Sequence, residues 1–168
     1  WHTQLPDETT VQLSYQISWP AFSRFQWGGL QADIMPTFSL ALGTVFDYLE
    51  GGFILRLGNQ LLHDYGPPRI QPSPPGSSYF SKPSGFNGYL FAGANARLIG
   101  HNIFLDGTLF KDSRQVDKEY GVADLIAGIN VVLAERYRLT YTHVFRTPEF
   151  EGQSGLERYG SLTLSMRF

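Results

Sequence analysis

Alternation of apolar and polar residues is the dominant pattern of this sequence. In residues 161–168 the four even-numbered residues are apolar and the four odd-numbered residues are polar or charged. Successive side chains of a β-strand point to opposite faces, so this stretch predicts a strand with one apolar and one polar face. The same alternation recurs in residues 11–19, 33–45, 47–57, 89–99, 103–111, 122–134 and 137–146. The pattern therefore predicts an all-β chain of about eight antiparallel strands and no helix.

The predicted strands have the lengths and connections of a transmembrane β-barrel. Most are 9 to 13 residues long, close to the roughly 9–11 residues of a tilted membrane-spanning strand. Short connections near residues 46, 101 and 135 alternate with long ones at 58–88, 112–121 and 147–160. Outer-membrane barrels combine tight periplasmic turns with long external loops, so we expect the three long connections on the external side.

Two further features refine this pattern. Residues 20–32 contain Pro20, Gly28 and Gly29 and are predicted to form a loop. Pro36 falls inside the second strand and predicts an irregularity there, because proline cannot donate to a strand ladder.

Charges on the polar face separate a membrane barrel from a soluble one. The arginines at 56, 97, 138, 146 and 167 and Asp124 lie at or near mid-strand on that face. A lipocalin-like soluble barrel, the structural rival, turns its apolar face inward, and unpaired charges in such an interior would be costly. The polar interior of a transmembrane barrel accepts charges, so the sequence favours an outer-membrane, multi-pass β-barrel of one domain, residues 1–168.

Composition excludes several classes of protein. The chain of 168 residues has a net charge of −2 and no cysteine, which argues against nucleic-acid binding and excludes disulfides and thiolate metal sites. It has no run of 18 apolar residues that would predict a transmembrane helix. It opens at Trp1 without a leader, so we expect a mature form or a fragment.

The candidate chemistry is sparse. Four histidines, His2, His63, His101 and His143, show no metal-ligand spacing. His2 lies close in sequence to Glu8, which makes these two residues weak candidates for a base–carboxylate couple; the alternative is that each is a solvated polar residue. We expect His101 and His143 to be interfacial.

Cations at the predicted outer rim could contact the phosphates of lipopolysaccharide, because Arg and Lys suit phosphate oxygens. These candidates are Lys111, Arg114, Lys118 and Arg146. Loop carboxylates such as Glu149 and Glu151 could bind calcium. Ordinary solvation is the alternative for each of these residues, and the metal ligands stay unassigned.

Several blocks of residues resemble one known family. They are residues 66–70 (GPPRI), 75–80 (PGSSYF), 102–107 (NIFLDG), 141–147 (YTHVFRT) with Glu149 and Phe150, and 160–168 (GSLTLSMRF). These blocks are similar to the outer-membrane lipid A 3-O-deacylase family, and the segment with Trp1, Gln4, Leu5 and Glu8 resembles a region midway along it. The resemblance covers essentially all 168 residues.

The resemblance implies a twelve-stranded barrel that hydrolyses the 3-linked acyloxyacyl ester of lipid A. It implies a histidine base that activates water, dependence on Ca²⁺, lipopolysaccharide as the partner, and a monomer. The family's histidine is expected upstream of Trp1, so its role is not carried onto His2. We therefore expect this chain to be the C-terminal portion of such an enzyme and to be inactive by itself.

The strand count raises one difficulty and leaves two alternatives. Counting back from a periplasmic Phe168 through eight strands puts residues 1–10 in the periplasm, whereas a site for outer-leaflet lipid A belongs on the outside. The main alternative is a complete small barrel, structural or pore-forming, with no enzymatic activity. A soluble β-barrel that binds an apolar ligand is the second.

Overall fold

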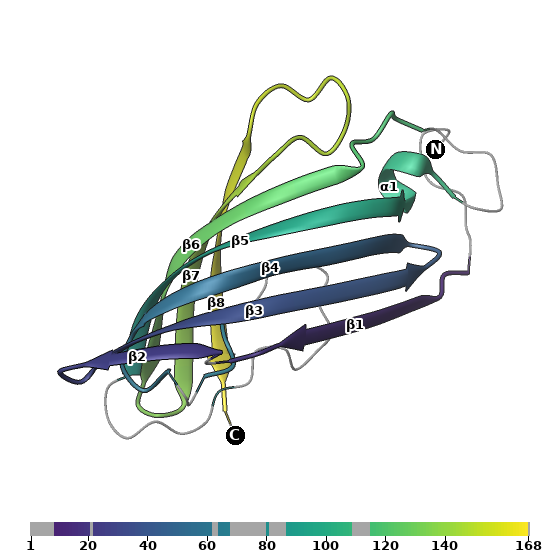
Figure 1. Ribbon diagram of the computed structural model, residues 1–168. Helices are drawn as coiled ribbons and strands as arrows, with labels where there is room; N and C mark the ends of the chain where they lie inside the picture. Colours follow the sequence, from purple (N-terminus) through teal and green to yellow (C-terminus); the bar gives the residue numbers. More distant parts are fainter. Residues whose placement is uncertain are drawn as a thin grey trace.

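The structure is a computed structural model that describes residues 9–20, 22–61, 64–67, 80, 87–108 and 115–167. Eight strands form one antiparallel sheet in the order β1-β3-β4-β5-β6-β7-β8, with β2 also paired to β3 (Figure 1). The strands are β1 (Gln12–Ser18), β2 (Ser23–Trp27), β3 (Leu30–Gly43), β4 (Phe46–Gly58), β5 (Asn87–Asn102), β6 (Gly121–Leu133), β7 (Tyr137–Arg146) and β8 (Glu157–Met166). The predicted all-β antiparallel architecture is confirmed.

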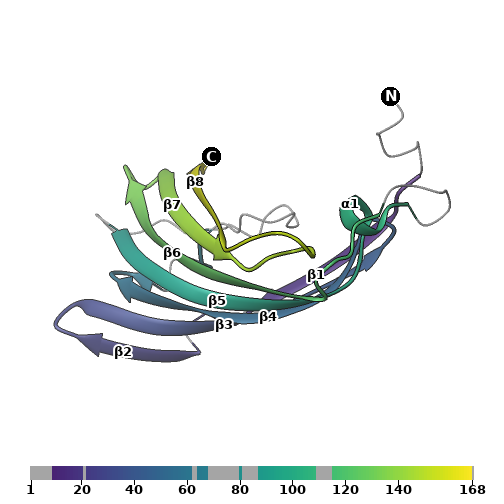
Figure 2. The same cartoon turned by 90° about the horizontal axis from the view of Figure 1, so that it is seen from above.

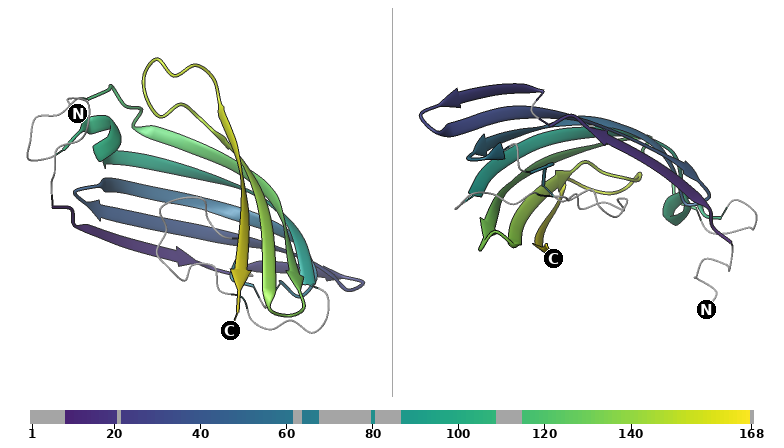
Figure 3. Two further views of the ribbon diagram at one scale, coloured as in Figure 1. Left: turned by 180° about the vertical axis from the view of Figure 1, so that it is seen from behind. Right: turned by 90° about the horizontal axis from the view of Figure 1, so that it is seen from below.

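The sheet is curved into a trough, with β6, β7 and β8 turned up from the plane of β3 and β4 (Figures 2 and 3). Among the described residues no pairing joins β8 to β1, so the wall is open between these two strands. We call the concave side the inner face and the convex side the outward face. The end where β8 finishes is called the C-terminal end, and the opposite end, which carries the helix α1 (Ile103–Asp106), is called the α1 end.

The alternation predicted from the sequence sorts the side chains between these faces. On β8, Leu162 and Leu164 are 70% and 69% exposed on the outward face. On the inner face Arg56 and Arg138 are 2% and 0% exposed. A soluble barrel would have the reverse arrangement. The apolar face therefore points away from the concave side, as it does in a barrel surrounded by lipid.

The structure differs from the sequence-based prediction at residues 103–111. Residues 103–106 form α1, not a strand, and residues 109–111 lie outside the described part of the chain. The Asn102 side chain caps the helix by accepting from the Phe104 N–H at 3.1 Å, and Gly107 ends it with φ of 77°. These caps satisfy helix-terminal backbone groups that a strand would pair with a neighbour.

A strand also occurs where a loop was expected. Residues 20–32 contain β2 and its turn to β3 at Gly28 and Gly29, whose φ angles are 56° and 89°. Two consecutive residues with positive φ fit the type I′ turn that suits the twist of a hairpin.

β1 and β2 pair with successive parts of β3, in the same direction, and so act as one interrupted strand. Ser18 pairs with Thr37 and Ser23 with Ile34, so four residues on one side face two on the other. Pro36 lies at this break, and its carbonyl accepts from the Trp19 N–H at 3.1 Å. The N–H and C=O of a residue in an antiparallel strand point to the same side, so the missing donor of Pro36 faces the interruption. The predicted irregularity is confirmed.

The absence of a strand at residues 103–111 and the continuity of β1 with β2 reverse the direction predicted for the first strand. The wall then has seven strands in the described part of the chain, and β1 starts at the α1 end, where the Val11 N–H donates to the Thr44 hydroxyl at 3.0 Å. Residues 9–11 therefore lie at the end opposite to the finish of β8. The expectation that the segment before β1 meets the periplasmic end was wrong.

The distribution of the connections was also predicted wrongly. Residues 103–120 and 147–156 connect strands at the α1 end, but residues 59–86 connect β4 to β5 at the C-terminal end. The latter end also carries the tight turn at Ala134 and Glu135. The long connections therefore do not share one side of the sheet.

Four aromatic residues near strand ends divide between the two faces of the sheet. Trp19 and Tyr137 are 45% and 41% exposed. Tyr89 is buried on the inner face, and Tyr48 lies beneath the guanidinium of Arg97, 5.1 Å from it.

Among the described residues, no helix has the length and hydropathy needed to cross a membrane.

Candidate functional site

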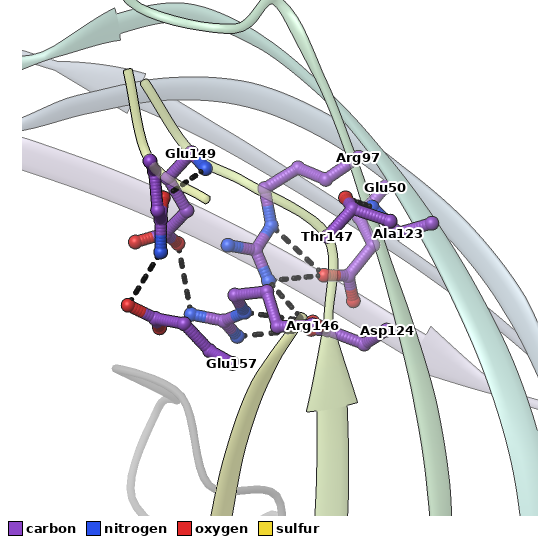
Figure 4. A network of polar contacts seen from close by, with 9 residues as sticks. Glu50, Arg97, Ala123, Asp124, Arg146, Thr147, Glu149 and Glu157 are labelled. Atoms are coloured by element: carbon purple, nitrogen blue, oxygen red, sulfur yellow. Dashed lines mark hydrogen bonds and ion pairs between the residues drawn. The ribbon is translucent and has the colours of Figure 1, made fainter. Parts of the chain in front are cut away.

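Polar side chains of the inner face gather into two networks, one at each end of the sheet. The α1-end network comprises Glu50, Arg97, Asp124, Arg146 and Glu149 (Figure 4). The C-terminal-end network comprises Asp33, Arg56, Asp64, Asn130 and Arg138. In both, strand alternation brings the charges to one face, and the antiparallel register brings them together.

In the α1-end network two arginines join carboxylates of neighbouring strands. Arg146 donates from Nε and Nη2 to the two Asp124 oxygens at 2.7 and 2.9 Å, and from Nη1 to Glu149 at 2.9 Å (Figure 4). Arg97 donates to Glu50 Oε2 at 2.7 and 3.0 Å, and its Nη2 lies 3.8 Å from Asp124. Such two-pronged pairs fix orientation as well as charge, so this network joins β4 through β7.

The network continues into the loop between β7 and β8. The Gln153 side chain accepts from the Glu149 N–H at 2.7 Å and donates to Glu157 at 2.6 Å. Thr147 accepts from the Ala123 N–H at 2.9 Å. The start of this loop is thereby held against the ends of β6 and β8.

The C-terminal-end network is more deeply buried and includes a residue from outside the strands. Arg56 donates to both oxygens of Asp33, at 2.6 and 2.8 Å, and both side chains are fully buried. Asp64, from the connection after β4, accepts from Asn130 at 2.8 Å and from Arg138 at 3.3 Å. The network therefore ties a connecting segment to the wall.

Beside α1, Asp106 is the centre of a smaller cluster. Its Oδ2 accepts from Lys118 Nζ at 2.6 Å and from the Asn102 N–H at 2.7 Å. His101 Nδ1 lies 3.6 Å from the same oxygen, which is too far for a hydrogen bond. The His101 Nε2 is buried, so it is not placed to meet a substrate. His101 thus faces inward, and the expectation that it would be interfacial was wrong.

The comparisons with known proteins bear on this arrangement. A family model described as outer membrane protein LpxR matches residues 1–168, the whole chain. The chain belongs to the LpxR family of outer-membrane proteins.

A solved structure, LpxR from Salmonella typhimurium, matches with a TM-score of 0.76 at 20% sequence identity. The match covers 100% of this chain and 55% of that one. This chain thus spans about half the length of the LpxR structure that it matches. No curated protein matches the chain.

Family, fold and orientation of the faces agree on one setting. This LpxR-family chain is part of an antiparallel transmembrane β-barrel of the outer membrane, with its apolar face toward lipid. The predicted resemblance, fold class and localisation are confirmed.

The structure locates two of the six predicted site residues. Lys118 and Arg146 are described, whereas His2, Glu8, Lys111 and Arg114 lie outside the described residues. Lys118 is 8% exposed at its side chain and also donates to the Gly100 carbonyl at 2.6 Å. Arg146 is occupied by two carboxylates. A phosphate would have to displace these partners, so the contacts of both cations give the predicted phosphate site no support.

The described residues also offer no fit for the calcium ion implied by the resemblance. Among them no three His, Asp or Glu side chains gather closely enough to hold a metal. Asp33, Asp64, Asp124 and Glu50 all accept hydrogen bonds from arginine, which competes with a cation for their oxygens. No step of a reaction is therefore routed through a metal at these residues.

The central residue that the sequence analysis missed is Asp64. It sits in a stretch rich in proline and glycine that shows no strand pattern. Its partner Arg138 is 74 residues away in sequence. Neither Arg56 before it nor Gly66 and Pro67 after it indicates this contact in the sequence.

Proposed function

We propose that this chain is part of an outer-membrane esterase that hydrolyses the 3-linked acyloxyacyl ester of lipid A. The observation that carries the proposal is the family match over every residue of the chain. Lipopolysaccharide is then the substrate and partner, and the protein acts as a monomer. The activity belongs to the whole protein, because this chain covers only 55% of the LpxR structure that it matches.

The direction of β1 supports this proposal. Outer-membrane barrels place tight turns in the periplasm. Among the described residues, the C-terminal end carries two tight turns, at residues 28–29 and 134–135, against one at the α1 end, at residues 44–45. The α1 end is then external. Thr9 and Val11 lie at that end, so the chain enters β1 from the side of outer-leaflet lipid A. The difficulty raised by counting strands in the sequence is thereby removed.

The reaction needs a base and a stabilised oxyanion. A histidine takes a proton from water as the water oxygen adds to the ester carbonyl. The intermediate then collapses: the bond from the carbonyl carbon to the sugar oxygen breaks, the histidinium gives its proton to that oxygen, and the free sugar hydroxyl and an acyloxyacyl carboxylic acid result. The resemblance implies that this base is a histidine upstream of Trp1. His2 and Glu8 are the alternative candidates within this chain. The predicted Ca²⁺ dependence is a separate proposal.

A complete structural barrel without activity is the second candidate. The observation that favours it is that the charged groups of both inner-face networks are engaged with one another. Such networks stabilise a wall and carry out no chemistry. A pore is disfavoured, because residues of the connection after β4 fill the inner face at the C-terminal end.

The test is mass spectrometry of lipid A from cells that express the full-length protein. We expect a mass loss of one acyloxyacyl unit, which persists with His2→Ala and disappears after chelation of calcium. His143→Ala is the control, because His143 shares the outward face with Tyr141. Unchanged lipid A with folded wild-type protein would reject the esterase. Loss of activity with His2→Ala would assign the base to His2 instead of to a residue upstream of Trp1.

A further inference from the structure

The described residues of the connection after β4, 59–61, 64–67 and 80, lie against the inner face of the sheet. Asn59 is fixed to the start of β5 by two hydrogen bonds with the Gly88 backbone, at 3.1 and 2.8 Å. Two residues further, the Leu61 N–H donates to the Gln31 side chain at 3.0 Å, and Leu61 is completely buried. We call residues 59–61 and 64–67, together with Phe80, the plug segment.

Asp64 ties the plug segment to three strands. Its carboxylate accepts from Asn130 of β6 and Arg138 of β7, and its backbone carbonyl accepts from Arg56 of β4 at 2.8 Å. The same carboxylate closes a local turn by accepting from the Gly66 N–H at 2.7 Å. Asp64 is 1% exposed. Its ion pair and hydrogen bonds are therefore shielded from water. Such contacts are stronger in the protein interior than on the surface.

Close packing accompanies this tether. Gly66 lies against the Met35 side chain so tightly that an added Cβ would overlap the terminal methyl group. Pro67 is buried, and the Phe80 ring, 5% exposed, lies 4.9 Å from the guanidinium of Arg138. Phe80 is also bridged to Asp64 through the backbone. The plug segment thus shares a core with the wall.

The two ends of the inner face differ in this respect. At the α1 end, the four side chains that span the wall, from Glu50 to Arg146, come from the strands themselves. At the C-terminal end a segment between strands takes the central position, and its Leu61 belongs to one apolar cluster with Met35 and Ile54 of the wall. The C-terminal end is therefore filled by chain that is not part of the wall.

We propose that the plug segment closes the lumen of the complete barrel at its C-terminal end, and that Asp64 is the tether that keeps it closed. The folded protein then passes no ions, although its inner face is polar enough to hold water. Loss of the Asp64 carboxylate removes an acidic partner of the buried Arg138. The segment then leaves the wall and a conducting path opens. This inference does not depend on the proposed esterase activity.

The experiment measures ion conductance of the full-length protein in planar lipid bilayers. We expect a silent wild type and a steady conductance with Asp64→Asn. The matched control is Asp124→Asn, which removes the same charge from the α1-end network without touching the plug segment. Folding of each variant is checked by its heat-modifiable mobility on gels, and Asp64→Asn/Arg138→Gln supplies a variant with balanced charge that should also conduct.

A second measurement reports the position of the plug segment directly. A cysteine placed by Leu61→Cys should resist a water-soluble thiol reagent in the otherwise wild-type protein and react in the Asp64→Asn background. A conducting wild type would overturn the proposal. So would silent, folded Asp64 variants, or equal conductance from Asp64→Asn and Asp124→Asn, since the leak would then come from the wall.

Discussion

Leu162 offers a direct test of which face of the sheet meets lipid. Its side chain is 70% exposed on the outward face, and it lies next to the midpoint of the ten-residue strand β8. A residue of a strand rises about 3.3 Å, or roughly 2.3 Å in depth at a tilt of 45°. On this scale β8 spans about 21 Å of depth, and Leu162 lies within about 2 Å of the midplane.

Leu162→Arg should therefore destabilise the folded barrel strongly. An arginine on the lipid face at the midplane costs about 2–4 kcal/mol, which lowers the folding equilibrium constant roughly 30- to 700-fold. Ser161→Arg is the matched control at the same depth, because Ser161 faces the polar lumen, and its cost should be near zero. Met166→Arg, on the same face but about 10 Å from the midplane, should cost about 1 kcal/mol.

The assay is equilibrium unfolding of the full-length protein from phospholipid vesicles in guanidinium, followed by tryptophan fluorescence. The ranking of the three variants carries the information. If Ser161→Arg cost as much as Leu162→Arg, or if Met166→Arg cost more, the assignment of the outward face to lipid would be refuted.

Two further predictions use the same assay. Gly128→Ala should cost about 1–3 kcal/mol by overpacking, since its Cβ would overlap the Phe91 ring and a backbone carbonyl of β7; Gly51→Ala, whose Cβ meets no atom within 4 Å, should be neutral, and equal costs would contradict the packing. Ala134→Gly should stabilise the protein by about 1 kcal/mol, because Ala134 has φ of 48°. The same change at Ala127, inside β6, should instead cost about 0.5–1 kcal/mol. If both substitutions changed the free energy of unfolding in the same direction, strain at the turn would be excluded.

Periodicity identified the wall well because each strand has one face in lipid. β7 has the bounds that were predicted from sequence, residues 137–146, and β6 differs by one residue at each end. The prediction failed where local backbone chemistry outweighs the pattern. Residues 103–106 are too few for apolar spacing to distinguish a strand from a helix turn, and Asn102 and Gly107 decide the outcome by capping.

The sequence does contain a signal for β2, but that signal was interpreted as a loop. Gly28 and Gly29 form a two-residue hairpin turn between polar–apolar runs, yet together with Pro20 they suggested a loop. Because β2 was missed and a strand was added at 103–111, the count of eight was preserved while the direction of the first strand was reversed. A correct total therefore concealed an error in topology.

The candidate site was less predictable than the fold. Alternation tells which residues face inward but not which of them meet, since that depends on register across strands far apart in sequence. Lys118 and Arg146 were expected to be cations of the outer rim, and both are bound by carboxylates, Lys118 by Asp106 and Arg146 by Asp124. Asp64 had no periodic signal at all.

The outward face has a consequence for how this family diverges. Lipid chains are fluid and fill the space around any apolar side chain, so Leu, Ile, Val and Phe are nearly interchangeable where they project from the wall. The inner face is different, since a change at Arg56 or Asp64 must be matched by its partners. Half of each strand is thus free to drift, which accounts for a fold kept at a TM-score of 0.76 with only 20% identity. Relatives of this chain should be more alike at their inward positions than their overall identity suggests.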